Sequence, residues 1–138
     1  MDDDLQRFVE AQRNDYAIAL NEVRQGHKHS HWMWYIFPQL RGLGRSAMAH
    51  TYGIRDLQEA KDYLANPVLG SRLEEITRAV ASSGVTPRAI FGEVDYVKFV
   101  SCMTLFARAA GPASVFASAL DKLPGPDQKT ESLLGQAD

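Results

Sequence analysis

Along most of this chain, apolar residues recur at steps of three and four positions, and this spacing predicts amphipathic helices. The first apolar stripe extends from Leu5 to Val23 and predicts a helix from about Asp4 to Gln25. The acidic residues Asp2 to Asp4 supply N-cap candidates and a favourable charge for the start of that helix. Gly26 follows directly and is a typical C-cap residue. We therefore expect a long first helix that ends at this glycine.

Capping residues, prolines and glycines delimit the remaining helices. Ser46 and Asp56 are expected to cap the short helices that follow them, and Pro67 suits the first turn of a longer one. The later predicted helices are Ala47–Tyr52, Leu57–Ala65, Pro67–Ser82, a short turn from Thr86 to Phe91 that stops at Gly92, Asp95–Ala110, Pro112–Leu123, and a final turn or two over Gln128–Leu134. Asp95–Ala110 has so wide an apolar face that we expect a central, largely buried helix. No strand pair is convincing, so the pattern predicts an all-α fold, a compact multi-helical bundle.

One segment interrupts the helical pattern, from Gly26 to Ser46, with the sequence GHKHSHWMWYIFPQLRGLGRS. Its proline and glycines prevent one long helix. The part from His31 to Phe37 is either a short strand or one or two helical turns, and periodicity does not decide over so few residues. The residue before a proline is disfavoured in a helix, so any helix here must end near Ile36. We expect this crossing segment to pass between the helices.

The composition is that of one ordinary globular domain, which we expect residues 1–138 to form, with a core from about 4 to 135. Hydrophobic residues make up 45% and charged residues 23% of the chain, and the formal net charge is −2. Without an overall basic field, we expect no membrane partner and disfavour nucleic acid. The N-terminus carries no secretory signal, and Cys102 is the one cysteine. These features favour the cytoplasm.

Three strings occur in order along the chain, followed by SLLG near the end: HWMWYIFPQLRGLGRSAMAHTYGI, LANPVLGSRL and IFGEVDYVKFVSCMTLF. On these motifs the chain resembles the uncharacterised family known as domain of unknown function 1810. The resemblance implies a compact multi-helical fold like that of a mycobacterial member, and it carries no established activity. Cys102 departs from the family pattern, in which a second serine is common, so we expect no catalytic thiol there.

Both tryptophans of the chain lie in the crossing segment. On an extended backbone Trp32 and Trp34 share a face and form a platform on which a nucleobase or another flat ligand stacks. Most aromatic clusters belong to a core instead. We expect a mixed outcome, with one tryptophan buried and the other lining a cleft.

Positive charge is also concentrated in this segment. Lys28, Arg41 and Arg45 lie near two glycines that allow close backbone approach, and Ser46 begins a helix. Together they suit an anionic group, such as a phosphate or a carboxylate, at a helix N-terminus. The alternative is a glycine turn packed under the aromatic cluster.

Three histidines complete the segment. On an extended backbone His27, His29 and His31 point to one side, where three imidazoles bind a metal such as zinc. No acidic residue follows closely, so a solvated basic loop is favoured, and we predict no metal and no cofactor. Because imidazole titrates near neutral pH, His31 is also a candidate general base. The alternative is a structural histidine bonded to a backbone carbonyl.

We therefore predict a small-molecule-binding protein or an enzyme. Its cleft lies where residues 26–46 meet residues 98–104, and its ligand is a flat anionic metabolite resembling a nucleotide. His31 is the candidate catalytic residue. The candidate ligand-binding residues are Lys28, Ser30, Trp32, Trp34, Gln39, Arg41, Arg45, Ser46, Lys98, Ser101 and Thr104. The alternative is a non-enzymatic protein–protein interaction module, which predicts an exposed apolar surface in place of a concave polar pocket.

Overall fold

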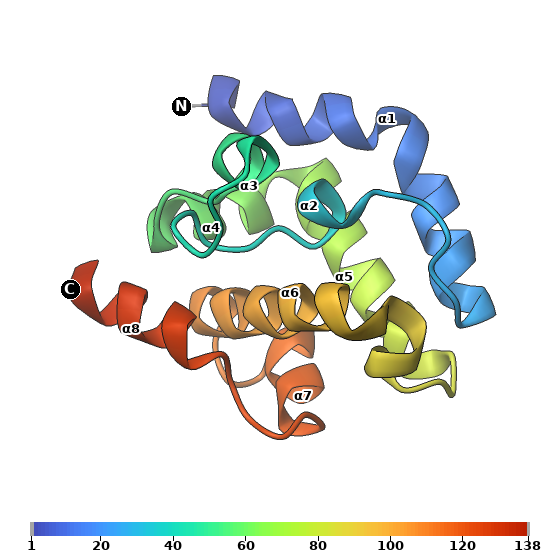
Figure 1. The fold of residues 1–138 in the computed structure, drawn as a ribbon. Helices are drawn as coiled ribbons and strands as arrows, with labels where there is room; N and C mark the ends of the chain where they lie inside the picture. The colour runs from blue at the N-terminus through green and yellow to red at the C-terminus, as the bar shows by residue number, and fades with distance from the viewer. Residues whose placement is uncertain (1, 138) are drawn as a thin grey trace.

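The computed structural model describes residues 2–137 of the chain and the side chains of residues 5–135. In that range the backbone forms the helices shown in Figure 1. In chain order they are α1 (Asp2–Gln25), α2 (Met33–Ile36), α3 (Ala47–Tyr52), α4 (Leu57–Ala65), α5 (Pro67–Ser82), α6 (Pro87–Ala110), α7 (Val115–Asp121) and α8 (Gln128–Ala137). The only β pairing in this range is one parallel bridge between Leu40 and Ile54. The predicted all-α fold is confirmed, whereas the N-cap candidates at Asp2 to Asp4 lie outside the described side chains.

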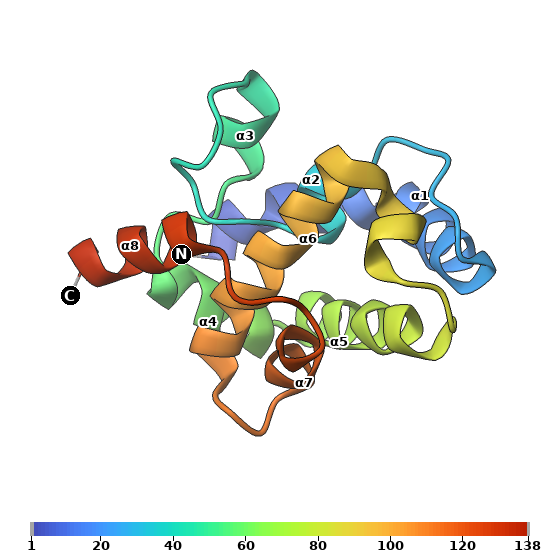
Figure 2. The ribbon, with the colours of Figure 1, turned by 60° about the horizontal axis from the view of Figure 1, so that its bottom comes forward.

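Helix α6 is the centre of the arrangement. It packs against α4, α7 and α8, while α1 packs along α5 and against α2. Figure 1 shows α2 between α1 and α6, and Figure 2 shows α5 beside α7. The wide apolar face of α6 accounts for its central position, because Phe99, Met103, Leu105 and Phe106 are all buried. Each such side chain contributes about 1.5–3 kcal/mol when it leaves water.

Side-chain caps fix the N-termini of the short helices as the sequence predicts. The Oγ of Ser46 accepts the third backbone amide of α3 at 3.1 Å, and Oδ1 of Asp56 accepts the third amide of α4 at 2.9 Å. Asn66 caps α5 in the same way, directly before Pro67 in its first turn. The predicted bounds of these three helices are therefore confirmed, because each follows from a local hydrogen bond.

The end of α1 is a Schellman motif. Gly26 has φ +81°, a left-handed conformation that glycine adopts without steric cost. The Gly26 amide donates to the carbonyl of Val23 at 2.9 Å, and the His27 amide donates to the carbonyl of Glu22 at 3.1 Å. These two bonds satisfy the last carbonyls of the helix and turn the chain into the crossing segment.

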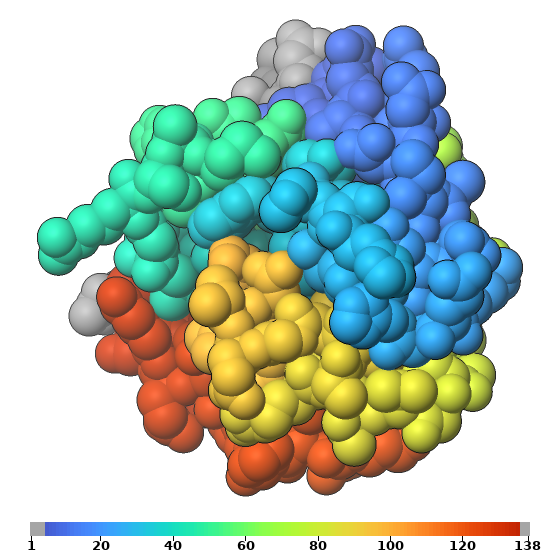
Figure 3. Space-filling view, turned by 45° about the vertical axis from the view of Figure 1, so that its right-hand side comes forward, coloured from blue at the N-terminus to red at the C-terminus, as the bar shows by residue number. Residues whose placement is uncertain are grey.

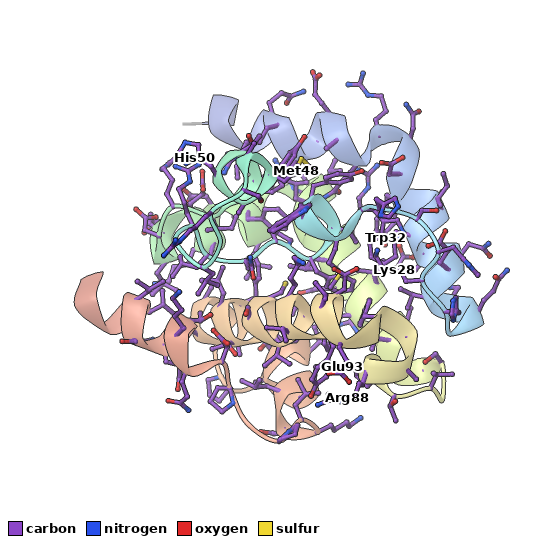
Figure 4. The ribbon with its side chains drawn as sticks, in the orientation of Figure 1. Lys28, Trp32, Met48, His50, Arg88 and Glu93 are labelled. Atoms are coloured by element: carbon purple, nitrogen blue, oxygen red, sulfur yellow. The ribbon has the colours of Figure 1, made fainter. Side chains whose placement is uncertain are left out.

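A kink at Gly92 divides α6 into two helical parts. Gly92 has φ +79° and ψ 166°, and the backbone is helical on both sides. The guanidinium of Arg88 bridges the kink to the carboxylate of Glu93 at 2.5 Å and lies 4.3 Å from the centroid of the Tyr96 ring. Figure 4 labels Arg88 and Glu93. The predicted stop at Gly92 is confirmed, but the second part begins immediately after it and not at Asp95.

Other predicted boundaries are also wrong. Helix α7 begins at Val115 and not at Pro112, because the Oγ of Ser114 accepts the amide of Ala117 at 3.1 Å and caps the helix there. It ends at Asp121 and not at Leu123. Helix α8 continues to Ala137, beyond the predicted turn or two. The part from His31 to Phe37, where periodicity does not decide between a strand and a helix, contains one helical turn, α2. This turn ends at Ile36, as expected.

Within residues 2–137, none of the helices combines the length and the apolar character needed to cross a bilayer.

Candidate functional site

A groove opens where the crossing segment, α6 and the start of α8 meet, and Figure 3 shows these three parts together on one face. Its volume is about 320 Å³. The groove is lined by Trp34, Gln39, Leu43 and Gly44 from the crossing segment, by Val94, Val97, Lys98 and Ser101 from α6, and by Asp127 and Lys129 from the C-terminal part. Four predicted ligand-binding residues are brought together in this wall: Trp34, Gln39, Lys98 and Ser101. We refer to this feature as the Trp34 groove.

Two lysines and one carboxylate form a charged cluster behind the groove. The Nζ of Lys98 lies 4.6 Å from the centroid of the Trp34 ring and 3.2 Å from Oδ1 of Asp95. The second oxygen of Asp95 is 2.9 Å from Nζ of Lys28, which in turn lies 5.0 Å from the centroid of the Trp32 ring. Figure 4 shows Lys28 beside Trp32. Each lysine therefore combines an ion pair with a cation–π contact, and the cluster has one more positive than negative charge.

Trp32 belongs to the core and not to the groove. Only 1% of its surface is exposed, and its indole Nε1 donates to Oε1 of Glu22 at 2.9 Å. The same carboxylate accepts the amides of His29 and Ser30 at 2.8 and 3.0 Å and the hydroxyl of Ser30 at 2.6 Å. Burial alone raises the pKa of Glu22, but these hydrogen bonds outweigh it and lower the pKa to about 2. The ionised carboxylate thus fixes the crossing segment to α1, and Ser30 is engaged in that structural role.

The aromatic platform expected for an extended segment does not form. Trp32 precedes α2 and Trp34 lies within it, and a helical turn rotates successive side chains by about 100°. Trp32 packs against the rings of Phe37 and Phe91, while Trp34 lines the groove. The expected mixed outcome, with one tryptophan buried and the other in a cleft, is confirmed.

The residues predicted to hold an anion at the start of α3 lie outside the groove lining: Lys28, Arg41, Arg45 and Ser46. The backbone amide of Arg41 donates to the carbonyl of Ile54 at 2.7 Å, and its Nε is buried with no hydrogen-bond partner among the described residues. Arg45 is exposed, and the hydroxyl of Ser46 accepts the Ala49 amide and caps its own helix, α3.

The two hydroxyl residues of α6 have different positions. Ser101 lines the groove, and its Oγ donates to the carbonyl of Val97 at 3.0 Å. Thr104 is buried outside the groove, where its Oγ1 donates to the carbonyl of Val100 at 2.8 Å and accepts the amide of Asp127 at 2.9 Å. Thr104 therefore links α6 to the start of α8, and its predicted contact with a ligand is not supported.

The histidines also lie away from the groove. His31 is exposed, and its backbone carbonyl accepts the hydroxyl of Tyr35 at 3.3 Å. The rings of His27 and His29 are 4.4 Å apart on the surface of the loop. Among the described residues, no group of three or more histidine, cysteine or acidic side chains is arranged to hold a metal ion. The three histidines thus do not share one face.

Several lining residues were missed by the sequence reasoning. Val94 and Val97 are 73% and 55% exposed on the α6 side of the groove, outside the apolar face of that helix. Asp95 does not line the groove but pairs with Lys98, and it was detectable because it lies three residues before Lys98 on the same helical face. Lys129 gave no local signal, because only the packing of α8 brings it to the groove.

Comparisons with known proteins agree with this fold. A family model described as a protein of unknown function, DUF1810, matches residues 2–134. Among solved structures, the chain is similar to the crystal structure of the conserved hypothetical protein Rv1873 from Mycobacterium tuberculosis. The sequence identity is 47%, the match covers 96% of each chain, and the TM-score is 0.92. No curated protein matches the chain.

Proposed function

We propose that this chain, which belongs to the DUF1810 family because that family's model spans residues 2–134, binds a small, flat, anionic ligand in the Trp34 groove. One observation carries the proposal. Trp34, Gln39, Lys98 and Ser101, taken from two segments far apart in the sequence, line one concave feature together with a second lysine, Lys129. Their side chains supply an aromatic face, an amide and two cations, which are the groups that a nucleotide-like ligand requires.

Each group has a distinct role in this proposal. The half-buried ring of Trp34 offers one face for stacking, while Lys98 lies over the ring at 4.6 Å and holds it in place. Lys98 and Lys129 neutralise the anionic group of the ligand. Asp127 also lines the groove, but its carboxylate accepts the amide and the hydroxyl of Thr130 at 2.8 and 2.6 Å and caps α8. Its charge is therefore directed toward the helix.

The proposal concerns binding and assigns no catalytic step. His31, the candidate general base, is exposed and lies outside the groove lining. The hydroxyl of Ser101 donates its hydrogen bond to the carbonyl of Val97, so among the described residues it is not paired with a base that would activate it.

Tryptophan fluorescence tests the proposal directly, with AMP and ribose 5-phosphate as probes. We expect AMP to quench the partly exposed Trp34, and the Trp34→Phe variant, which keeps Trp32 as its one tryptophan, to lose the quenching. Removing one charge with Lys98→Gln is expected to weaken AMP binding by about 5- to 30-fold, since a partly desolvated charge contributes roughly 1–2 kcal/mol. The matched control is Lys61→Gln, a change at an exposed lysine of α4. Equal affinity for AMP in Lys98→Gln and Lys61→Gln contradicts the proposal.

A protein-binding function is the second candidate, because Val94 and Val97 are strongly exposed beside the groove. Large exposed apolar side chains in one patch are typical of interaction surfaces. Sedimentation of the protein at increasing concentration tests the simplest partner, a second copy of the chain. Self-association that Val97→Glu abolishes, together with no response to either probe, favours this function over small-molecule binding.

A further inference from the structure

A second cavity lies on another part of the molecule, between the C-terminal half of α5, the α5–α6 turn, Phe99 of α6 and the end of α7. Its volume is about 220 Å³. Figure 2 shows α5 and α7 side by side there. None of its lining residues belongs to the Trp34 groove. We refer to it as the Thr77 cavity.

The walls of the Thr77 cavity are mostly apolar. Val80, Val85, Phe99 and Leu123 supply most of the hydrocarbon surface. Lys122 is the one charged residue that lines it, and this lysine is exposed at the end of α7. The apolar body and single cation define the chemistry of a complementary ligand, which has a hydrocarbon part and one negative charge.

Thr77 lines the cavity and carries a buried hydroxyl without a hydrogen-bond partner among the described residues. Only 1% of this residue is exposed. A threonine inside a helix ordinarily bonds to the carbonyl one turn earlier, and an unpaired buried hydroxyl is unfavourable. Because the hydroxyl makes no hydrogen bond among the described residues, a turn about χ1 toward a ligand breaks none. A ligand acceptor that meets the hydroxyl therefore restores a bond that the free protein lacks.

The turn that closes the cavity is fixed before any ligand arrives. The Oγ of Ser83 donates to the carbonyl of Val80 at 2.9 Å and accepts the amide of Val85 at 3.1 Å. The side chain of Val85 packs directly against Gly26, where an added Cβ would come within 2.6 Å of its Cγ2. A rigid wall costs little conformational entropy on binding, so a small ligand gains affinity from it.

The size of the cavity limits the ligand further. Pockets for drug-sized molecules measure about 300–1,000 Å³, whereas an apolar cavity of about 150 Å³ is enough to hold benzene. A volume of about 220 Å³ thus suits one aromatic ring or a short alkyl chain with a polar end. We propose that the Thr77 cavity is a binding site for small aromatic or aliphatic monocarboxylic acids, with the hydrocarbon part between Val80, Phe99 and Leu123 and the carboxylate shared by Thr77 and Lys122.

Amide chemical-shift titrations of the full chain test this site with three probes: phenylacetate, toluene and acetate. Phenylacetate carries both the ring and the charge, and the other two probes carry one each. We expect phenylacetate to bind at least tenfold more tightly than acetate, because burying a ring contributes roughly 1.5–3 kcal/mol. The amides that respond are expected to be those of the α5–α6 turn, near Gly84 and Val85.

Three variants locate the binding. Thr77→Val removes the hydroxyl at constant volume and is expected to weaken phenylacetate binding about fivefold to tenfold. Lys122→Gln is expected to weaken it about twofold to fivefold, as for an exposed charge pair. Ala81→Leu places a larger side chain at the exposed edge of the cavity and is expected to abolish binding. Ala17→Leu, at an exposed alanine of α1, is the matched control and leaves the affinity unchanged.

Each result bears on the proposal. Unchanged affinity in Thr77→Val or Ala81→Leu overturns it, because the ligand then lies elsewhere. Amide chemical-shift changes that phenylacetate causes only at Trp34 and Lys98 also overturn the proposal, because they assign the ligand to the Trp34 groove. Toluene binding as tightly as phenylacetate overturns the role of the carboxylate. Phenylacetate is expected to bind the Trp34→Phe protein normally, so failure of the groove proposal leaves this one standing.

Discussion

The carboxylate of Glu22 accepts four hydrogen bonds from three residues that follow it in the chain, and it does so as an anion. No local pattern in the sequence points to this role, since Glu22 lies on the long first helix and its partners lie beyond the Gly26 turn. The fold therefore depends on the ionisation of one buried acid.

Acid is expected to weaken the protein through Glu22. Its folded pKa of about 2 is below its ordinary value of 4.5, so its stabilisation is complete above about pH 5 and is lost as the pH falls toward 2. The difference corresponds to about 3 kcal/mol of unfolding free energy. Glu22→Gln is expected to destabilise the protein at pH 7 and to remove this part of the pH dependence, as measured by urea unfolding at pH 7 and pH 3. Glu74→Gln, at an exposed residue of α5, is the control. An equal pH dependence of stability in Glu22→Gln and the native protein contradicts the assignment.

Two glycines with similar backbone angles allow the effect of steric contact to be separated from that of φ. Gly26 and Gly84 have φ +81° and +76°, but an added Cβ at Gly26 lies 2.6 Å from Cγ2 of Val85, whereas nothing lies within 4 Å at Gly84. Gly84→Ala is expected to cost about 1 kcal/mol from its positive φ, and Gly26→Ala about 2–4 kcal/mol because overpacking is added. Thermal unfolding measures both. Equal losses show that Val85 moves aside freely, contrary to the rigid wall described for the Thr77 cavity.

At the scale of helices, one hydroxyl of α6 contributes to the attachment of α8, beside the buried side chains of Thr130 and Leu134. Thr104 accepts the amide of Asp127 at 2.9 Å, just before α8 begins. Thr104→Val removes that acceptor and is expected to destabilise the protein by about 1–3 kcal/mol and to speed hydrogen exchange at the Asp127 amide. Thr77→Val is the matched control, since it makes the same change at a buried hydroxyl without a partner, and it is expected to be neutral or slightly stabilising. Equal losses from the two changes contradict the link to α8.

Helix boundaries that depend on neighbouring residues were predictable from the sequence. The bounds of α3, α4 and α5 follow from caps at Ser46, Asp56 and Asn66, each of which bonds an amide two or three residues later. The predicted start of α7 was wrong because Pro112 and Ser114 are both suitable signals for the start of a helix. Only the structure shows that Ser114 is the N-cap. The crossing segment was ambiguous because a single helical turn is too short to show a period.

At the scale of the whole molecule, the sequence was sufficient to predict the all-α fold and the meeting of residues 26–46 with α6. It did not predict the third side of the groove, because Lys129 reaches it only through the packing of α8. The Thr77 cavity was not predicted either. Its walls come from three helices and a turn, and an unpaired hydroxyl is visible only once the neighbours of Thr77 are placed.

The central position of α6 makes its one thiol a probe of global unfolding. Cys102 is fully buried, and burial raises the pKa of its thiol. Labelling of the native protein by iodoacetamide is therefore expected to be at least about 1,000-fold slower than labelling of the protein unfolded in urea. The labelling rate is expected to increase with urea concentration, because urea lowers the free energy of unfolding and so raises the unfolded fraction. A rate that does not respond to low urea concentrations indicates local opening of α6 instead.

The bridge between Leu40 and Ile54 joins the two ends of the excursion that contains α3. The Arg41 amide donates to the Ile54 carbonyl and the Ile54 amide to the Gln39 carbonyl, at 2.7 and 2.9 Å, so these ends stay together whatever the chain does between them. Within α3 only Ala49 is buried, and Met48 and His50 face solvent (Figure 4). A loop of another length grafted between these ends is expected to reshape the rim beside Leu43 and Gly44. The graft has to keep Thr51 to Gly53, because Arg7 donates to the carbonyls of Thr51 and Gly53 and the ring of Tyr52 packs against Phe8.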